Sequence, residues 1–181
     1  MTRWTMVRRF LSLALVAAVT ACSEPTKPDA SATALTLFPE IKKSGLVECP
    51  TDVFLTASAY LDPLALVDQV VSVGAHSVSV PPGALPLGVP LLLTLTVPPS
   101  KYVEIVVTVN GLPHFQFALP VTVTVDYSRC TRSDIDRDPL RVWNIDPLFK
   151  TFMADMGGVD DKVARTVTFQ TDHFSGYAIA Q

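Results

Sequence analysis

Two stretches of this 181-residue chain alternate between apolar and polar side chains, and this pattern limits the folds open to it. In residues 91–97 and 121–127 every second position is Leu, Val or Tyr, and Thr fills most of the positions between. A period of two places successive side chains on opposite faces of a β-strand. Both stretches are therefore predicted to be strands with one buried face.

Apolar runs of strand length recur along most of the chain between turn residues. Asn110-Gly111 is typical of a hairpin turn, because both residues tolerate positive φ. A number of short strands at this spacing predicts an all-β fold, an antiparallel two-sheet β-sandwich. One short helical turn is considered, at residues 149–156. The further strands are predicted at residues 66–73, 77–80, 103–109, 115–119, 140–145, 163–169 and 177–180.

The first 21 residues have the pattern of a secretory signal peptide. Arg3, Arg8 and Arg9 precede a largely apolar run at residues 10–21, which is too short to span a bilayer, since about 20 apolar residues are needed. The run ends at Val-Thr-Ala-Cys22, which resembles the lipobox of bacterial lipoproteins. An ordinary cleavage site with an incidental cysteine is the alternative.

The resemblance to bacterial lipoproteins implies that residues 1–21 are removed and that the Cys22 thiol is lipidated. The residue after Cys22 is Ser23 and not an aspartate, and by the same resemblance this implies transfer to the outer membrane of a two-membrane cell. Residues 23–33 are polar, contain proline and lack large apolar side chains, so residues 22–40 are predicted to be the lipidated N-terminus and a flexible tether, and residues 41–181 to be the sandwich. The membrane is thus the expected partner, through a lipid anchor in the bacterial cell envelope.

The charge of the chain argues against a nucleic-acid partner. It has 14 basic and 17 acidic residues, which gives a net charge of -3. Proteins that bind nucleic acid carry a basic patch or stripe, and none is present. We therefore expect no nucleic acid among its partners.

Two cysteines remain once Cys22 is assigned to lipid. Cys49 and Cys130 each lie beside a predicted turn, and an exported protein folds in an oxidising compartment. We predict a disulfide between them. Two buried, reduced thiols are the alternative.

Three aspartates, Asp134, Asp136 and Asp138, alternate as in the first half of an EF-hand calcium loop. That loop needs glycine at its sixth position and glutamate at its twelfth, where this chain has Pro139 and Ile145. We expect a solvated loop and no cofactor. A loose calcium site of another type is the alternative.

Other residues that serve as ligands give weaker signals. His76, His114 and His173 are far apart in sequence, and no Cys-x-x-Cys spacing occurs, so a zinc site has little support. Trp143 lies in an apolar run, which favours a place in the core over an exposed ligand platform.

Three segments, in order, resemble bacterial members of the ZU-five domain family, named for the zonula occludens and uncoordinated-five proteins. They are Val78-Ser-Val-Pro-Pro-Gly-Ala-Leu85, Leu119-Pro-Val-Thr-Val-Thr-Val-Asp-Tyr127 and Asp172-His-Phe-Ser-Gly-Tyr-Ala178. The resemblance covers residues 45–181. It implies a β-sandwich that acts as a non-enzymatic interaction or scaffolding module, with no cofactor and with a protein partner that it does not specify.

In some members of this family the chain cuts itself within a His-Phe-Ser tripeptide. Carried over to this sequence, the Ser175 hydroxyl would attack the carbonyl of Phe174, with His173 as the base. Such a reaction needs a strained peptide bond. The alternative, which needs no strain, is a structural corner in which Asp172, His173 and Ser175 are held by hydrogen bonds beside a buried Phe174.

Overall fold

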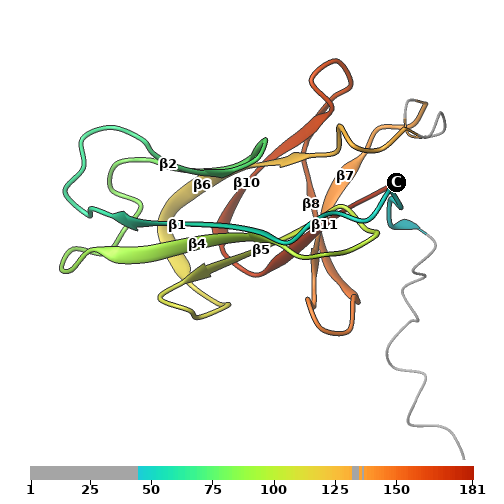
Figure 1. The fold of residues 1–181 in the computed structure, drawn as a ribbon. Helices are drawn as coiled ribbons and strands as arrows, with labels where there is room; N and C mark the ends of the chain where they lie inside the picture. The colour runs from blue at the N-terminus through green and yellow to red at the C-terminus, as the bar shows by residue number, and fades with distance from the viewer. Residues whose placement is uncertain (1–44, 132–134, 136) are drawn as a thin grey trace, which may run out of the picture. The chain divides into compact units, whose positions relative to one another are not determined.

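The computed structural model describes residues 45–131, 135 and 137–181 (Figure 1). These residues form two antiparallel β-sheets that pack face to face, and no helix occurs among them. The predicted all-β, two-sheet architecture is confirmed. The predicted signal peptide, Cys22 and the tether lie outside the described residues, and so do residues 41–44 of the predicted sandwich.

One sheet has six strands and the other has five, and every neighbouring pair is antiparallel. The six-stranded sheet has the order β1 (Leu55–Leu61), β4 (Leu91–Val97), β5 (Glu104–Val109), β11 (Gly176–Ala180), β7 (Arg141–Ile145) and β8 (Phe152–Gly157). The five-stranded sheet has the order β2 (Gln69–Val73), β3 (His76–Val80), β6 (Gln116–Asp126), β10 (Thr166–His173) and β9 (Val159–Asp161).

The two alternating stretches form β4 and most of β6, and their apolar side chains face the space between the sheets. Leu93, Leu95, Val121 and Val123 are fully buried, whereas the Thr side chains between them are half-buried on the outer faces. Outward threonines pair across strands, as in the hydrogen bond of 3.1 Å between the hydroxyls of Thr124 and Thr168. The period of two therefore fixed the inward face of each strand.

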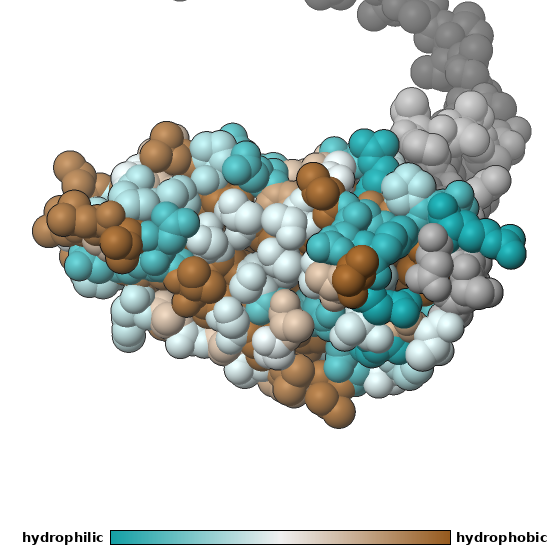
Figure 2. Space-filling model, turned by 90° about the horizontal axis from the view of Figure 1, so that it is seen from above, coloured by the Kyte–Doolittle hydropathy of each residue, from teal (hydrophilic) through white to brown (hydrophobic). Residues whose placement is uncertain are grey.

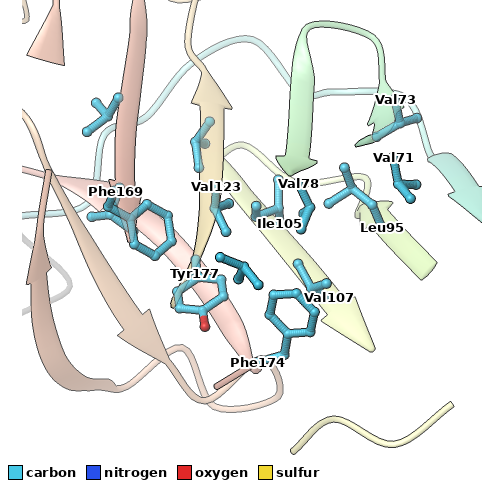
Figure 3. Close-up of a cluster of buried hydrophobic side chains, with 14 of the residues drawn as sticks. Val71, Val73, Val78, Leu95, Ile105, Val107, Val123, Phe169, Phe174 and Tyr177 are labelled. Carbon is cyan, nitrogen blue, oxygen red and sulfur yellow. The ribbon is translucent and has the colours of Figure 1, made fainter. Parts of the chain in front are cut away.

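The main core fills the space between the two sheets. Figure 3 shows side chains from both sheets converging there, with Phe174 and Tyr177 among them. Burial of this apolar area is the main stabilising term of the fold. Its largest fully buried members are Tyr127, Tyr177, Phe174, Leu61, Leu93, Leu95, Ile105, Ile135, Leu140 and Ile179.

The strand nearest the C-terminus, β11, lies in the middle of its sheet and is buried on both faces. Tyr177 and Ile179 belong to the main core, whereas Ala178 and Ala180 belong to a second, smaller apolar cluster on the other face. Its neighbours are β5 and β7, so it has hydrogen-bonded partners along both edges. The strand predicted at residues 177–180 is confirmed.

The N-terminal end of the described chain is joined to the same region. The N–H of Val47 donates to the carbonyl of Ile179 at 3.0 Å, and the N–H of Gln181 donates to the carbonyl of Gly45 at 3.0 Å. Figure 1 shows the beginning of the described chain beside its C-terminus. The described part of residues 45–181 thus contains both sheets and both apolar clusters.

The short helical turn considered at residues 149–156 is wrong. The Asp146 carboxylate accepts hydrogen bonds from the N–H groups of Leu148 and Phe149, which closes a tight turn, and Lys150 then takes a φ of 56°. This left-handed residue ends the turn, and β8 begins at Phe152.

Candidate functional site

The His-Phe-Ser segment is the passage of the chain from one sheet to the other. His173 ends β10 in the five-stranded sheet, and Gly176 begins β11 in the six-stranded sheet. Phe174 and Ser175 span the crossing. The N–H of Phe174 donates to the carbonyl of Phe115 at 3.0 Å, and the carbonyl of Ser175 accepts from the N–H of Val107 at 3.2 Å. The main chain is therefore held on both sides of the Phe174–Ser175 peptide bond.

Phe174 anchors the crossing in the main core. Its side chain is fully buried, and its ring meets the edge of the Phe117 ring with centroids 4.6 Å apart. Phe117 makes a similar contact with Phe115, at 4.8 Å. Edge-to-face pairs of this kind add to the energy of burial, and the predicted burial of Phe174 is confirmed.

Both ring nitrogens of His173 have partners. Nδ1 lies 3.0 Å from Oδ1 of Asp172, and Nε2 lies 3.1 Å from Nδ2 of Asn144 on β7. A carboxylate oxygen can only accept, so Nδ1 donates to Asp172. The hydrogen bond from His173, with that from Gln116, holds the pKa of Asp172 below its usual value.

Ser175 makes a separate contact. Its side chain is buried, and its hydroxyl donates to the carbonyl of Gly176 at 3.1 Å. In self-cleavage a base takes the proton of the serine hydroxyl, and the serine oxygen attacks the carbonyl carbon of the preceding residue. Here the hydroxyl is directed at the carbonyl that follows it, while the two nitrogens of His173 are directed at Asp172 and Asn144.

Tyr177 fastens the crossing from the other side. Its hydroxyl donates to the main-chain carbonyl of His173 and lies 3.5 Å from the Thr171 hydroxyl. Burial raises the pKa of Tyr177 to about 12, so this phenol remains a hydrogen-bond donor at any ordinary pH. Its ring packs on Phe169 of β10 with centroids 4.9 Å apart. Tyr177 therefore joins the two sheets at the point where the chain passes between them.

Gly176 is required by close packing. A Cβ atom added there would lie 3.0 Å from the carbonyl oxygen of Ile145 and 3.2 Å from Cβ of Pro147. Its φ is not in the left-handed region, so conformational freedom is not the reason for glycine at this position. Glycine at this position therefore allows the close approach of the end of β7 and of Pro147.

The predicted disulfide joins Cys49 to Cys130, with Cα atoms 4.8 Å apart. It links the N-terminal segment to the loop after β6. Next to it, the Arg129 guanidinium donates to the carbonyl of Tyr102 at 2.7 Å and pairs with the carboxylate of Asp52 at 3.1 Å. The bridge therefore lies within a network that ties the first described residues to the body of the sandwich.

Of the three alternating aspartates, only Asp138 lies within the described residues. Its side chain is exposed, and its carbonyl accepts a hydrogen bond of 2.7 Å from Nζ of Lys162, which also binds the carbonyl of Ile135. A lysine ammonium thus occupies the carbonyls of this loop. Over the residues that the structure describes, no group of three or more metal-ligating side chains occurs. Asp134 and Asp136 lie outside them.

The side chain of Asp160 also holds the end of that loop, at Leu140. Its carboxylate accepts from the Tyr127 hydroxyl at 2.6 Å, from the N–H of Leu140 at 2.7 Å and from Lys162 at 2.7 Å. Burial acts to raise the pKa of Asp160, but these three hydrogen bonds outweigh it and hold the pKa below its usual value.

The remaining histidines make contacts of their own. His76 is buried, its Nδ1 accepts from the N–H of Asp126 at 3.2 Å, and burial lowers its pKa. His114 is exposed in the loop before β6. Trp143 is half-buried and packs on Phe152 with ring centroids 5.0 Å apart, beside the second cluster and outside the main core.

Two contacts of the crossing were not predicted from the sequence: the one from Asn144 to His173, and the one from the Tyr177 hydroxyl to the carbonyl of His173. The signal for Asn144 was a single polar residue at the buried end of an apolar run, where an unpaired amide would be costly.

In the described part of the chain no helix is long and apolar enough to cross a membrane. No known protein family, characterised protein or solved structure matches this chain.

Proposed function

We propose that this protein is a lipid-anchored protein of the bacterial cell envelope whose β-sandwich is a non-enzymatic interaction module. The disulfide between Cys49 and Cys130 carries the proposal, because disulfides form and persist in oxidising compartments. The leader before Cys22 supplies a route of export, and its cysteine supplies an acceptor for lipid. Ser23 favours the outer membrane as the destination.

We also infer that the sandwich is of the ZU-five type. The three segments that carry the resemblance fall on neighbouring strands of one sheet and on the crossing that follows. Val78 in β3 pairs with Val123 in β6, and Val121 in β6 pairs with Thr171 in β10. Segments that are distant in sequence but adjacent in a sheet support a shared fold more strongly than isolated matches do.

The contacts of the His-Phe-Ser crossing favour the non-enzymatic interpretation over self-processing between Phe174 and Ser175. The His173 ring is held by Asp172 and Asn144, and the Ser175 hydroxyl is held by Gly176. These groups satisfy buried or half-buried polar atoms, which is the role expected of a structural corner.

Lipid attachment is tested with the whole chain, produced in a bacterium with two membranes. We expect the wild-type protein to enter the detergent phase of a phase-separating extraction, and its mass to equal residues 22–181 plus acyl groups. Cys22→Ser is the matched control, and it should stay in the aqueous phase or keep its leader. A wild-type protein that is aqueous, or that begins at a residue other than Cys22, contradicts the proposal.

The module itself is tested by crosslinking in intact cells, followed by mass spectrometry of the material that the sandwich recovers. A partner found with the wild-type chain should be lost when a charge placed in the core unfolds the sandwich, as in Val123→Asp, and kept with Gly45→Ala, for which the added contact is ordinary. An enzymatic turnover of any small molecule by the purified sandwich would overturn the non-enzymatic assignment.

A further inference from the structure

Two loops lie side by side at the end of the sandwich opposite the disulfide. Residues 62–68 lead from β1 to β2, and residues 81–90 lead from β3 to β4, so each passes between the sheets. Leu61 pairs with Leu91 in one sheet and Gln69 pairs with Val80 in the other. Because both loops begin and end on paired residues, they are neighbours, and Figure 1 shows them at the left of the molecule.

These two loops carry large aliphatic side chains that face solvent. Single exposed apolar residues are ordinary on a protein surface, whereas several on adjacent loops mark a site of interaction. Figure 2 shows hydrophobic residues gathered at this end. The side chains, which we call the apolar end, and their exposed fractions are Leu64 72%, Leu66 91%, Val67 72%, Leu87 83% and Val89 72%.

Hydrogen bonds hold the loops in shape. The Asp62 carboxylate accepts from the N–H of Leu64 at 2.9 Å, and the N–H of Asp62 donates to the side chain of Gln69 at 2.7 Å. In the other loop, the carbonyl of Ala84 accepts from the N–H of Ala118 at 2.9 Å. These bonds hold the main chain of each loop close to its apolar side chains, which reduces the entropy that the loops lose on binding.

The charged side chains near the apolar end indicate which kind of lipid surface it could bind. Between Gly45 and Ser128 the only lysine or arginine is Lys101, which lies in the connection between β4 and β5, at the other end of β4 from these loops. The acidic side chains of the first loop are Asp62 and Asp68, and their carboxylates bind Leu64 N–H and the Ser79 hydroxyl. The apolar end thus offers no attraction for anionic lipid, which basic residues would provide.

We propose that the apolar end inserts into the interfacial region of an electrically neutral lipid bilayer. Its side chains project from two neighbouring exposed loops, and a fluid surface adapts to such projections where a rigid protein would need matching pockets. They are all Leu and Val, while the residues that dominate protein–protein binding are Trp, Tyr and Arg. Burial of aliphatic side chains at the acyl boundary supplies the affinity, as it does for other interfacial segments.

The inference rests on the proposed function only in treating the sandwich as a binding module, because it requires no acylation of Cys22. If Cys22 is acylated, residues 23–44 separate the anchor from the first described residue, and 22 residues span up to about 75 Å when extended. The apolar end would then reach the bilayer that holds the anchor.

The test uses residues 23–181, which lack both the leader and Cys22, so binding by the sandwich is measured apart from the anchor. Flotation with phosphatidylcholine vesicles should recover the protein in a lipid-dependent manner. Addition of phosphatidylglycerol should not increase binding, and 0.5 M salt should not reduce it, because the attraction is not electrostatic. No binding to phosphatidylcholine, or binding that requires anionic lipid, overturns the inference.

Two matched pairs of substitutions locate the contact. Val67→Ser with Val89→Ser should lower vesicle partitioning by about 10- to 100-fold, since full burial of one valine is worth about tenfold. Val53→Ser with Val163→Ser is the control, at side chains that are 66% and 97% exposed on other parts of the surface, and it should leave partitioning unchanged. Equal losses in both pairs would refute the site.

A fluorescent probe gives a second readout. A tryptophan introduced by Leu66→Trp should shift to shorter wavelength on vesicle binding and be quenched by lipids brominated in the acyl chain. Val163→Trp should show neither change. If a crosslinked envelope protein is lost from the Val67→Ser, Val89→Ser variant while vesicles never bind, the apolar end docks a protein and the inference is wrong.

Discussion

The hydroxyl of Tyr177 donates a hydrogen bond to the main-chain carbonyl of His173, four residues earlier and in the opposite sheet. The phenol is fully buried, so no solvent replaces it if it is removed. The carbonyl keeps a second hydrogen bond, of 2.8 Å from the Thr171 hydroxyl, so Tyr177→Phe should lower the free energy of unfolding by about 0.5–1.5 kcal/mol, the usual net effect of losing one hydrogen bond. Urea titration measures the change. Tyr60→Phe, at a side chain that is 74% exposed, is the control and should have no effect.

The bridge between Cys49 and Cys130 closes a sequence separation of 81 residues. The chain-entropy model gives about 4–5 kcal/mol for a loop of that length, as an upper value. Cys49→Ala with Cys130→Ala should accordingly lower the urea midpoint by a large margin. In the wild-type segment 45–181, thiol labelling after denaturation should find none before reduction and two after it. Two labels without reductant would mean that the bridge does not form.

The Phe174–Ser175 bond is expected to stay intact. The Ser175 hydroxyl donates to the carbonyl of Gly176 and the His173 ring pairs with Asp172 and Asn144, so the serine is not hydrogen-bonded to the histidine that would act as its base. Denaturing mass spectrometry should show full-length chains for both the wild type and Ser175→Ala. A wild-type chain shortened by residues 175–181, together with an intact Ser175→Ala, would establish self-cleavage.

Asp160 should make stability depend on acid. Its pKa is lower in the folded state than its ordinary value of 3.8, so the unfolded chain binds the proton first as pH falls. Its contribution is thus complete well above pH 3.8 and is lost as the pH falls through the folded pKa. Asp160→Asn should lower the free energy of unfolding at pH 7, and the deficit should shrink toward pH 2.

Asp138→Asn is the control for Asp160→Asn, because Asp138 binds Lys162 through its main-chain carbonyl, which the substitution keeps. Its unfolding curve should match that of the wild type at both pH values. If the deficit of Asp160→Asn is the same at pH 7 and pH 2, the carboxylate is not the source of the effect.

Gly176→Ala should destabilise the sandwich by about 1–3 kcal/mol, because the new methyl group meets the carbonyl of Ile145 and the ring of Pro147. Gly45→Ala is the comparison, since its added Cβ would find its nearest neighbour at 3.6 Å, an ordinary contact. Thermal unfolding distinguishes them. Equal melting temperatures for the two variants would show that β7 can move away at little cost.

Strands with strong alternation were predictable from sequence, and weakly patterned ones were not. β4 and β6 follow from their aliphatic residues at every second position. β1 escaped prediction because Ala57, Ser58 and Ala59 give it little hydrophobic contrast, and pairing with β4 is what makes it a strand. The predicted strand at residues 163–169 begins later, at Thr166, because the Asp161 carboxylate binds the N–H groups of Val163 and Ala164 in a turn.

In the candidate site, too, some features could be predicted from the sequence and others could not. The His-Phe-Ser tripeptide and the burial of Phe174 could be predicted, because they depend on neighbouring residues. The partner of His173 could not, because Asn144 lies 29 positions away and reaches it only through the packing of one sheet on the other. The disulfide was predictable from compartment and cysteine count, without any knowledge of distance.

The position of β11 also bears on how the protein is made. Until residues 176–180 have left the ribosome, β5 and β7 have no strand between them, and the six-stranded sheet exists only as two separate halves. A nascent chain in this state cannot complete its core, because Tyr177 and Ile179 are still missing from it. The position of this strand would thus delay folding of the sandwich until residues 176–180 have been made.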